Sequence, residues 1–173
     1  MTREQLEHII RAVASISGEN SIVIIGSQAI LGSYADAPAS LLTSMEADAF
    51  PADAPEKSDI IDGCIGELSP FHETYGYYAH GITPDAAELP AHWRSRLVRV
   101  ESPATQGNVG LCLSPADLAV SKLLAGRDKD IDFVRGMLSA QLVTLTAIQE
   151  LEQELSPKQQ ARLAALYALF PEA

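Results

Sequence analysis

Glu46 and Asp48 stand two positions apart in the segment from Leu41 to Phe50, where polar and apolar residues alternate. This alternation predicts a β-strand, and side chains two positions apart on a strand share one face, about 6.6 Å apart at their backbones. Two such carboxylates can hold divalent metal ions for phosphoryl transfer, and their oxygen ligands favour Mg²⁺ or Mn²⁺. A solvated strand face produces the same pattern, so both interpretations stay open at this point.

A glycine and a serine, Gly26 and Ser27, follow the apolar run from Ile22 to Ile25. Four β-branched residues without alternation predict a strand that is covered on both faces. A glycine after such a strand lets backbone N–H groups approach a phosphate, and a helix expected from Gln28 to Tyr34 would add free donors. A plain turn is the alternative for an isolated Gly-Ser pair.

Two cations follow in the second half of the chain. Lys122 lies among leucines on an expected helix, so its amine must reach solvent or meet an anion, and a triphosphate is a fitting anion. Arg127 comes five residues later, directly before Asp128 and Asp130. A network of weak ion pairs on a helix surface is the alternative for this dense charge cluster.

Two histidines, His72 and His80, lie in an aromatic, glycine-broken region from Ser69 to Pro90 that we assign to no element. Neither has a cysteine or a second histidine at ligand spacing, so we expect loop histidines rather than a general base or a metal ligand. Asp117 is best explained as an acid in the first turn of a helix.

The elements that must position these residues predict an α+β fold, with a small mixed or antiparallel sheet backed by helices and a C-terminal helical bundle. Residues 1–113 are expected to form the α/β core, and residues 114–173 a helical part packed on it in one compact unit. The apolar stripes of the last two helices could pack together or against a second subunit, which leaves a homo-oligomer open. The expected strands are 22–25, 41–50, 96–101 and 108–113, and the expected helices are 2–18, 58–68, 114–126, a helix from about 128, one through 145–155 and one through 156–170.

The composition excludes several classes of protein. The 173 residues are 47% hydrophobic and 20% charged, which indicates a folded domain, and no apolar run reaches the ~20 residues that span a bilayer. The N-terminus lacks the basic start and apolar core of a signal peptide, so we expect a cytoplasmic protein. The net charge of -11 argues against broad binding of duplex DNA. Cys64 and Cys112 lack C-x-x-C spacing, and we expect both to be buried thiols.

The order of these motifs resembles the nucleotidyltransferase superfamily related to DNA polymerase beta. In that superfamily an apolar strand, Gly-Gly or Gly-Ser and a helix come first, as in Ile22 to Ile30, and an acid-x-acid strand follows, as in Glu46-Ala47-Asp48. Lys122 through Asp130 is similar to a later helix of the minimal bacterial branch that includes abortive-infection toxin-type enzymes. Some of these relatives are half of a toxin-antitoxin pair or act in phage defence.

The resemblance implies a Mg²⁺- or Mn²⁺-dependent transfer of a nucleoside monophosphate from a nucleoside triphosphate to an acceptor hydroxyl, with RNA, protein or a small molecule as the acceptor. It also implies a role for each matched residue. Glu46 and Asp48 would hold the metal, Gly26 and Ser27 would bind the triphosphate with Lys122 and Arg127, Lys122 would neutralise developing charge, and Asp128 and Asp130 would support the site through ion pairs.

Two departures from the family pattern affect the expected activity. Glu46 stands where aspartate is usual, and the strand expected to carry a third acid offers Arg99, with Glu101 near its end as the possible third acid. A chain without the third acid could bind a nucleotide and transfer nothing. The alternative to an enzyme is therefore an inactive copy of the fold that binds nucleotides or partners as a regulatory module.

Overall fold

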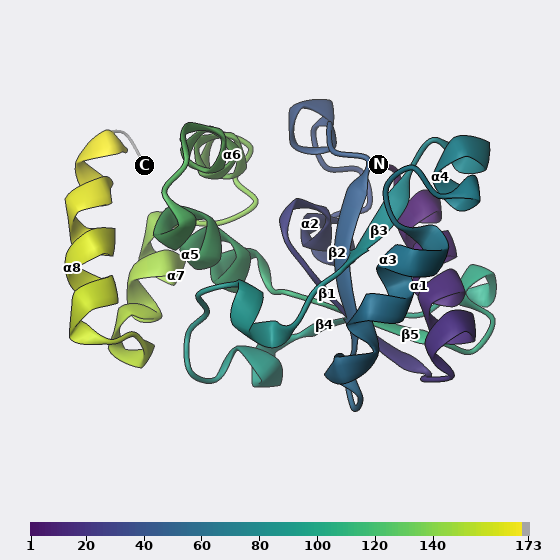
Figure 1. Ribbon diagram of the computed structural model, residues 1–173. Helices are drawn as coiled ribbons and strands as arrows, with labels where there is room; N and C mark the ends of the chain where they lie inside the picture. The colour runs from purple at the N-terminus through teal and green to yellow at the C-terminus, as the bar shows by residue number, and fades with distance from the viewer. Residues whose placement is uncertain (171–173) are drawn as a thin grey trace.

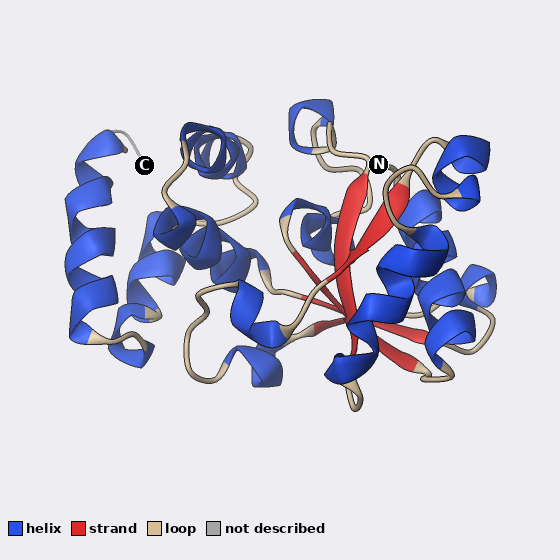
Figure 2. Cartoon of the chain, viewed as in Figure 1, coloured by secondary structure: helices blue, strands red, loops and turns tan. Residues whose placement is uncertain are grey.

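The computed structural model describes residues 1–170 of the chain. Its centre is a five-stranded mixed sheet with the strand order β3-β2-β1-β5-β4 (Figure 2). The central strand β1 pairs antiparallel with β2 and parallel with β5, while β2 pairs parallel with β3 and β5 antiparallel with β4. The strands are β1 (Ser21–Ile25), β2 (Glu46–Pro51), β3 (Tyr78–Gly81), β4 (Val98–Val100) and β5 (Val109–Cys112).

Helices cover both faces of this sheet and continue as a helical part at the C-terminal side (Figure 1). Helices α1 and α3 pack against each other and against β2 and β3, while α2 contacts β4 and β5 and packs on α5. No helix within residues 1–170 has the length and apolar character that crossing a membrane requires. The helices are α1 (Arg3–Ser17), α2 (Ile30–Ser33), α3 (Ser58–Ile65), α4 (Pro70–Tyr75), α5 (Pro115–Ala125), α6 (Asp128–Ser139), α7 (Leu145–Glu150) and α8 (Pro157–Leu166).

The α+β prediction is confirmed, and local sequence signals explain most of the elements. The side chain of Thr2 accepts a hydrogen bond from the Gln5 amide and completes the expected capping box of α1, which ends at Gly18 in the left-handed conformation. The apolar residues of β1 are buried, as a strand between two helical layers requires. Leu163 of α8 is buried where α8 packs on α5. The apolar stripe of the last helix is therefore covered in part by the same chain.

Several local expectations are wrong. The strand expected from Leu41 begins only at Glu46, after a 3₁₀ turn over Ala39–Leu41. The helix expected from Gln28 to Tyr34 divides into a 3₁₀ turn over Ser27–Ala29 and the single helical turn α2. The region from Ser69 to Pro90 contains the helix α4 and the strand β3 in place of a loop. Cys64 is exposed because it lies on the solvent side of α3, whereas Cys112 is buried in β5 as expected.

An ion-pair network joins the sheet-side loop before β4 to the C-terminal helices. The Arg96 guanidinium donates to both carboxylate oxygens of Asp117, at 2.9 and 2.7 Å, and to both oxygens of Glu154, at 2.7 and 2.9 Å. Asp117 is fully buried in the first turn of α5 and also accepts a hydrogen bond from the Ser114 hydroxyl. The Arg96 charge therefore compensates a carboxylate that is removed from water.

Replacing Arg96 by alanine is expected to destabilise the fold strongly, because it leaves the buried Asp117 carboxylate without its cation. We expect the Arg96→Ala variant to lose about 3 kcal/mol of unfolding free energy in urea denaturation. The matched control is Arg99→Ala, which removes an arginine whose pair with Glu101 is exposed and is expected to cost below about 1 kcal/mol. Equal losses in the two variants would contradict the role given to Arg96.

Candidate active site

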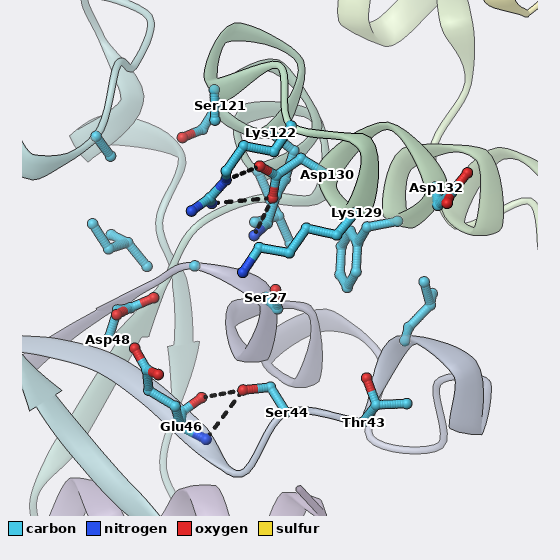
Figure 3. A pocket seen from close by; sticks show the side chains of 18 of the residues that line it. Ser27, Thr43, Ser44, Glu46, Asp48, Ser121, Lys122, Lys129, Asp130 and Asp132 are labelled. Atoms are coloured by element: carbon cyan, nitrogen blue, oxygen red, sulfur yellow. Dashed lines mark hydrogen bonds and ion pairs between the residues drawn. The ribbon is translucent and has the colours of Figure 1, made fainter. Parts of the chain in front are cut away.

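A cleft of about 850 Å³ opens between β1, β2 and β3 on one side and α5 and α6 on the other (Figure 3). It brings together residues that are up to about a hundred positions apart in the sequence. Its polar lining consists of Gly26, Ser27, Ser40, Thr43, Ser44, Glu46, Asp48, His80, Glu88, Ser121, Lys122, Arg127, Lys129, Asp130 and Asp132.

Strand pairing places an acidic pair beside a histidine. In the parallel register of β2 and β3, Glu46 lies beside Tyr78 and Asp48 lies beside His80. The His80 Nδ1 atom is 3.2 Å from Asp48 Oδ1 and 3.3 Å from Glu46 Oε1. The Tyr78 hydroxyl donates to Glu46 Oε2 at 3.0 Å and fixes that carboxylate. One ligand atom from each of Glu46, Asp48 and His80 lies within 4.8 Å of the other two, which is close enough for one metal ion.

The glycine turn after β1 lies directly against the second acid. Gly26 has a φ of 69°, in the region that favours glycine, and a Cβ atom at this position would overlap Asp48 Oδ2. Ile25 is the antiparallel partner of Asp48, which explains the close approach. The turn and the carboxylate therefore form one surface, and a side chain at position 26 would displace Asp48.

The pKa values of Asp48, His80 and Tyr78 are all shifted by their surroundings. Burial and the charge of Glu46 raise the pKa of Asp48 to about 6. Burial lowers the pKa of His80, but the hydrogen bond with Asp48 and the charges of Asp62, Asp48 and Glu46 outweigh it, so the His80 pKa lies above its ordinary value. Burial and the hydrogen bond to Glu46 raise the pKa of Tyr78 to about 12, which keeps its hydroxyl a donor at neutral pH.

Lys122 and Arg127, the two cations expected to bind a triphosphate, each form an ion pair with Asp130. The Asp130 side chain, 1% exposed, accepts from Lys122 Nζ at 3.0 Å and from Arg127 Nε at 2.5 Å. Lys122 also lies over the Phe133 ring, with Nζ 5.4 Å from the ring centre. Burial opposes ionisation of Asp130, but the two donors hold the pKa of its carboxyl below the usual range.

Lys129 is the cation of this cleft that sequence analysis did not identify. It lies in the first turn of α6 and lines the cleft, and Figure 3 shows its amine pointing toward the side on which Ser27 lies. It forms no ion pair with any residue between positions 1 and 170. Its charge is therefore available to a bound anion.

The structure separates the sequence-predicted site residues into two groups. Gly26, Ser27, Glu46, Asp48, Lys122, Arg127 and Asp130 line the one cleft, so the expected convergence is present, while their roles in binding and catalysis stay predictions.

Glu101 and Asp128 do not line the cleft. Glu101 follows β4, which is separated from β2 by β1 and β5, and it is exposed and paired with Arg99. The structure therefore places it away from the acidic pair, and its role as a third acid stays an untested prediction. Asp128 is an exposed residue at the start of α6, and its supporting role stays a prediction. The expectation of His80 as a loop histidine is wrong, because His80 lies on β3 against both acids.

The fold and the cleft together define a nucleotidyltransferase-like α+β protein. A family model described as "Nucleotidyltransferase of unknown function (DUF6036)" matches residues 4–165, and the chain belongs to this family. No curated protein and no solved structure matches the chain.

Replacing Asp48 by asparagine is expected to stabilise the protein at pH 8 in the absence of divalent ions. The native carboxyl has a pKa of about 6, above the unfolded value of about 3.9, so its ionisation disfavours the folded state. We expect the Asp48→Asn variant to gain about 1–2 kcal/mol of unfolding free energy at pH 8, measured by urea denaturation with a chelator.

The gain should shrink as the pH falls below about 6, because native Asp48 then binds its proton in the unsubstituted protein. Asp53→Asn, which removes an exposed carboxylate outside the cleft, serves as the control and should change little at either pH. A gain that does not depend on pH would show that the burial of charge on Asp48 is not the cause.

Proposed function

We propose that this protein is a metal-dependent nucleotidyltransferase that moves a nucleoside monophosphate from a nucleoside triphosphate to an acceptor hydroxyl. The observation that carries the proposal is the meeting of the Gly26 turn, the acidic pair and the unpaired Lys129 in one cleft. Family membership supports the reaction class, and the geometry supports the division of roles given below.

The triphosphate binds between the glycine turn and α6. Gly26 leaves its backbone open to a phosphate and Ser27 adds a hydroxyl, both on the cleft wall. Lys129 supplies the positive charge from the opposite wall, while Lys122 and Arg127 hold Asp130 and so fix the start of α6. Lys122 thus has a positioning role in place of the direct contact that the sequence suggests.

The donor set of the cleft fits a divalent ion. Glu46 and Asp48 present carboxylate oxygens on one face of β2, which suits Mg²⁺ or Mn²⁺. Such an ion would supply charge neutralisation at the reacting phosphate. The Tyr78 hydroxyl bond holds Glu46 in the orientation that ligation needs.

Transfer requires an acceptor hydroxyl in line with the α-phosphorus. A new bond forms between the acceptor oxygen and the α-phosphorus as the bond to the oxygen shared with the β-phosphorus breaks, and pyrophosphate leaves. The acceptor proton passes to solvent water in the open cleft. We propose RNA or protein as the acceptor, and action within a toxin-antitoxin or phage-defence system, from the resemblance of Lys122 through Asp130 to the toxin-type branch.

One observation favours the alternative of an inactive nucleotide-binding module. The side chain beside the two acids on the neighbouring strand β3 is His80, an imidazole and not a third carboxylate. A site without a third acid could bind a nucleotide and transfer nothing. A module of this kind would bind nucleoside triphosphates in the same cleft and transfer no label. Binding and transfer must therefore be measured separately.

Replacing Lys129 by methionine is expected to weaken triphosphate binding without loss of stability. Loss of one charge-assisted contact, worth about 1.5–3 kcal/mol, corresponds to about 10- to 100-fold in dissociation constant. Calorimetric titration of ATP, GTP, CTP and UTP with Mn²⁺ measures the effect, and Lys158→Met on the exposed start of α8 is the control.

The Lys122→Met variant distinguishes the role of Lys122 from that of Lys129. It should lower the unfolding free energy, because the buried Asp130 loses one of its two donors. Unchanged stability together with lost nucleotide binding in Lys122→Met, and full binding in Lys129→Met, would reverse the assignment.

Transfer activity is expected with α-labelled nucleotides and not with γ-labelled ones, because pyrophosphate carries the γ-phosphate away. The protein is incubated with each of the four labelled nucleotides, Mn²⁺ or Mg²⁺ and cell extract, and label in RNA, protein and small molecules is measured. Asp48→Asn should reduce transfer at least about 100-fold, because it removes a metal-binding oxygen. Binding without transfer would favour the regulatory module, and absence of both would remove the nucleotide proposal altogether.

A further inference from the structure

The acidic pair of this cleft has an imidazole as its third neighbour. The Nδ1 atom of His80, at 3.2 Å from Asp48 and 3.3 Å from Glu46, is the ring atom that faces both carboxylates. His80 itself is half exposed on the cleft side, so the group is open to an ion from solvent. Two oxygen donors and one nitrogen donor thus meet at the cleft wall.

The position of His80 is fixed by the sheet rather than by a loop. Ala79, between Tyr78 and His80, is fully buried, which holds the two polar side chains on the cleft side of β3. The next residue, Gly81, donates its amide to Asp62 of α3 at 3.1 Å, and a Cβ atom there would overlap the Ser58 carbonyl. The end of β3 is therefore anchored on α3, which holds the backbone of His80 beside the acids.

The donor atoms differ from those that Mg²⁺ prefers. Mg²⁺ takes oxygen ligands and water in a small, near-ideal octahedron, whereas imidazole suits divalent ions of the first transition row. Two carboxylates with one imidazole therefore fit a first-row divalent transition ion, and Mn²⁺ is one such ion that also accepts carboxylate oxygens readily.

We propose that His80 is a metal ligand together with Glu46 and Asp48, and that this centre selects a first-row divalent transition ion such as Mn²⁺ over Mg²⁺. The inference rests on the proposed function for its biological use, since the ion would serve nucleotide transfer. The metal site itself can be tested without any nucleotide, so its failure and the failure of the transfer activity are separate results.

Mn²⁺ is the probe of the first experiment, at pH 8, because a proton on the imidazole competes with the ion for the same nitrogen and the binding of that proton weakens as pH rises. The loss of the free Mn²⁺ signal in electron paramagnetic resonance gives the dissociation constant, and displacement by Mg²⁺ gives the preference between the two ions. The variants are His80→Asp, which converts the donor set to three carboxylates, and His80→Ala. His92→Asp, which changes an exposed histidine outside the cleft, is the matched control.

We expect His80→Ala to weaken Mn²⁺ binding about 10- to 100-fold, the range found when metal-site groups are removed. His80→Asp should keep an ion but lower the preference for Mn²⁺ over Mg²⁺ at least about tenfold. In the unsubstituted protein with ¹⁵N-labelled histidine, electron spin echo modulation should show a nitrogen coupled to Mn²⁺, and this coupling should vanish in both His80 variants and persist in His92→Asp.

Three results would overturn the proposal. Binding of Mn²⁺ that is unchanged or tighter in His80→Ala would show that the histidine acts as a built-in cation of the acidic pair rather than as a ligand. Equal affinity of the unsubstituted protein for Mn²⁺ and Mg²⁺ would remove the selectivity. Spectra without a histidine nitrogen at bound Mn²⁺ would place the ion elsewhere, whatever the transfer assay shows. Circular dichroism of each variant verifies that the fold is retained.

Discussion

The parallel pairing of β2 with β3 is the constraint on which the site depends. One register sets Tyr78 beside Glu46 and His80 beside Asp48, so both contacts of the acidic pair follow from a single alignment. A slip of one residue would turn Ala79 into the cleft and bury the polar side chains, because strand side chains alternate between faces. The apolar core under Ala47, Ala49 and Ala79, all fully buried, excludes that slip.

Several energetically costly groups lie at the cleft or in the 3₁₀ turn that follows Gly26. Gly26 has a positive φ. Asp48 has a pKa of about 6, so above this pH it carries a negative charge next to that of Glu46. The fully buried Gln28 amide has no hydrogen-bond partner within residues 1–170. An unsatisfied buried amide alone costs about 1–3 kcal/mol. Strained and desolvated groups gathered around one cleft are typical of functional sites, where the surrounding fold holds them in place. In this protein the Arg96 network and the buried strands are part of that fold.

Sequence patterns predicted the elements well where the signal is local. The capping box at Thr2, the apolar run of β1 and the alternation of Glu46-Ala47-Asp48 each specify an element within a few residues, and the fold class follows from them. The strand β3 escaped because it is four residues long and its pairing is non-local. Its segment Tyr78-Ala79-His80 nevertheless repeats the polar-alanine-polar pattern of β2, a signal that could have identified His80.

The roles of the cations could not be read from spacing, since they depend on which carboxylate each one meets. Lys122 and Arg127 both reach Asp130, a buried residue whose partners are fixed only by the packing of α5 against α6. Among the described residues of the cleft, Lys129 is then the lysine without an ion pair. The cleft also holds several carboxylates, and the protein as a whole has a net charge of -11. Under the proposed function, a bare triphosphate would be repelled at this wall, and its charge would be met jointly by Lys129 and by an ion on the acidic pair. Nucleotide and metal are therefore expected to bind cooperatively, since each supplies the charge that the other requires.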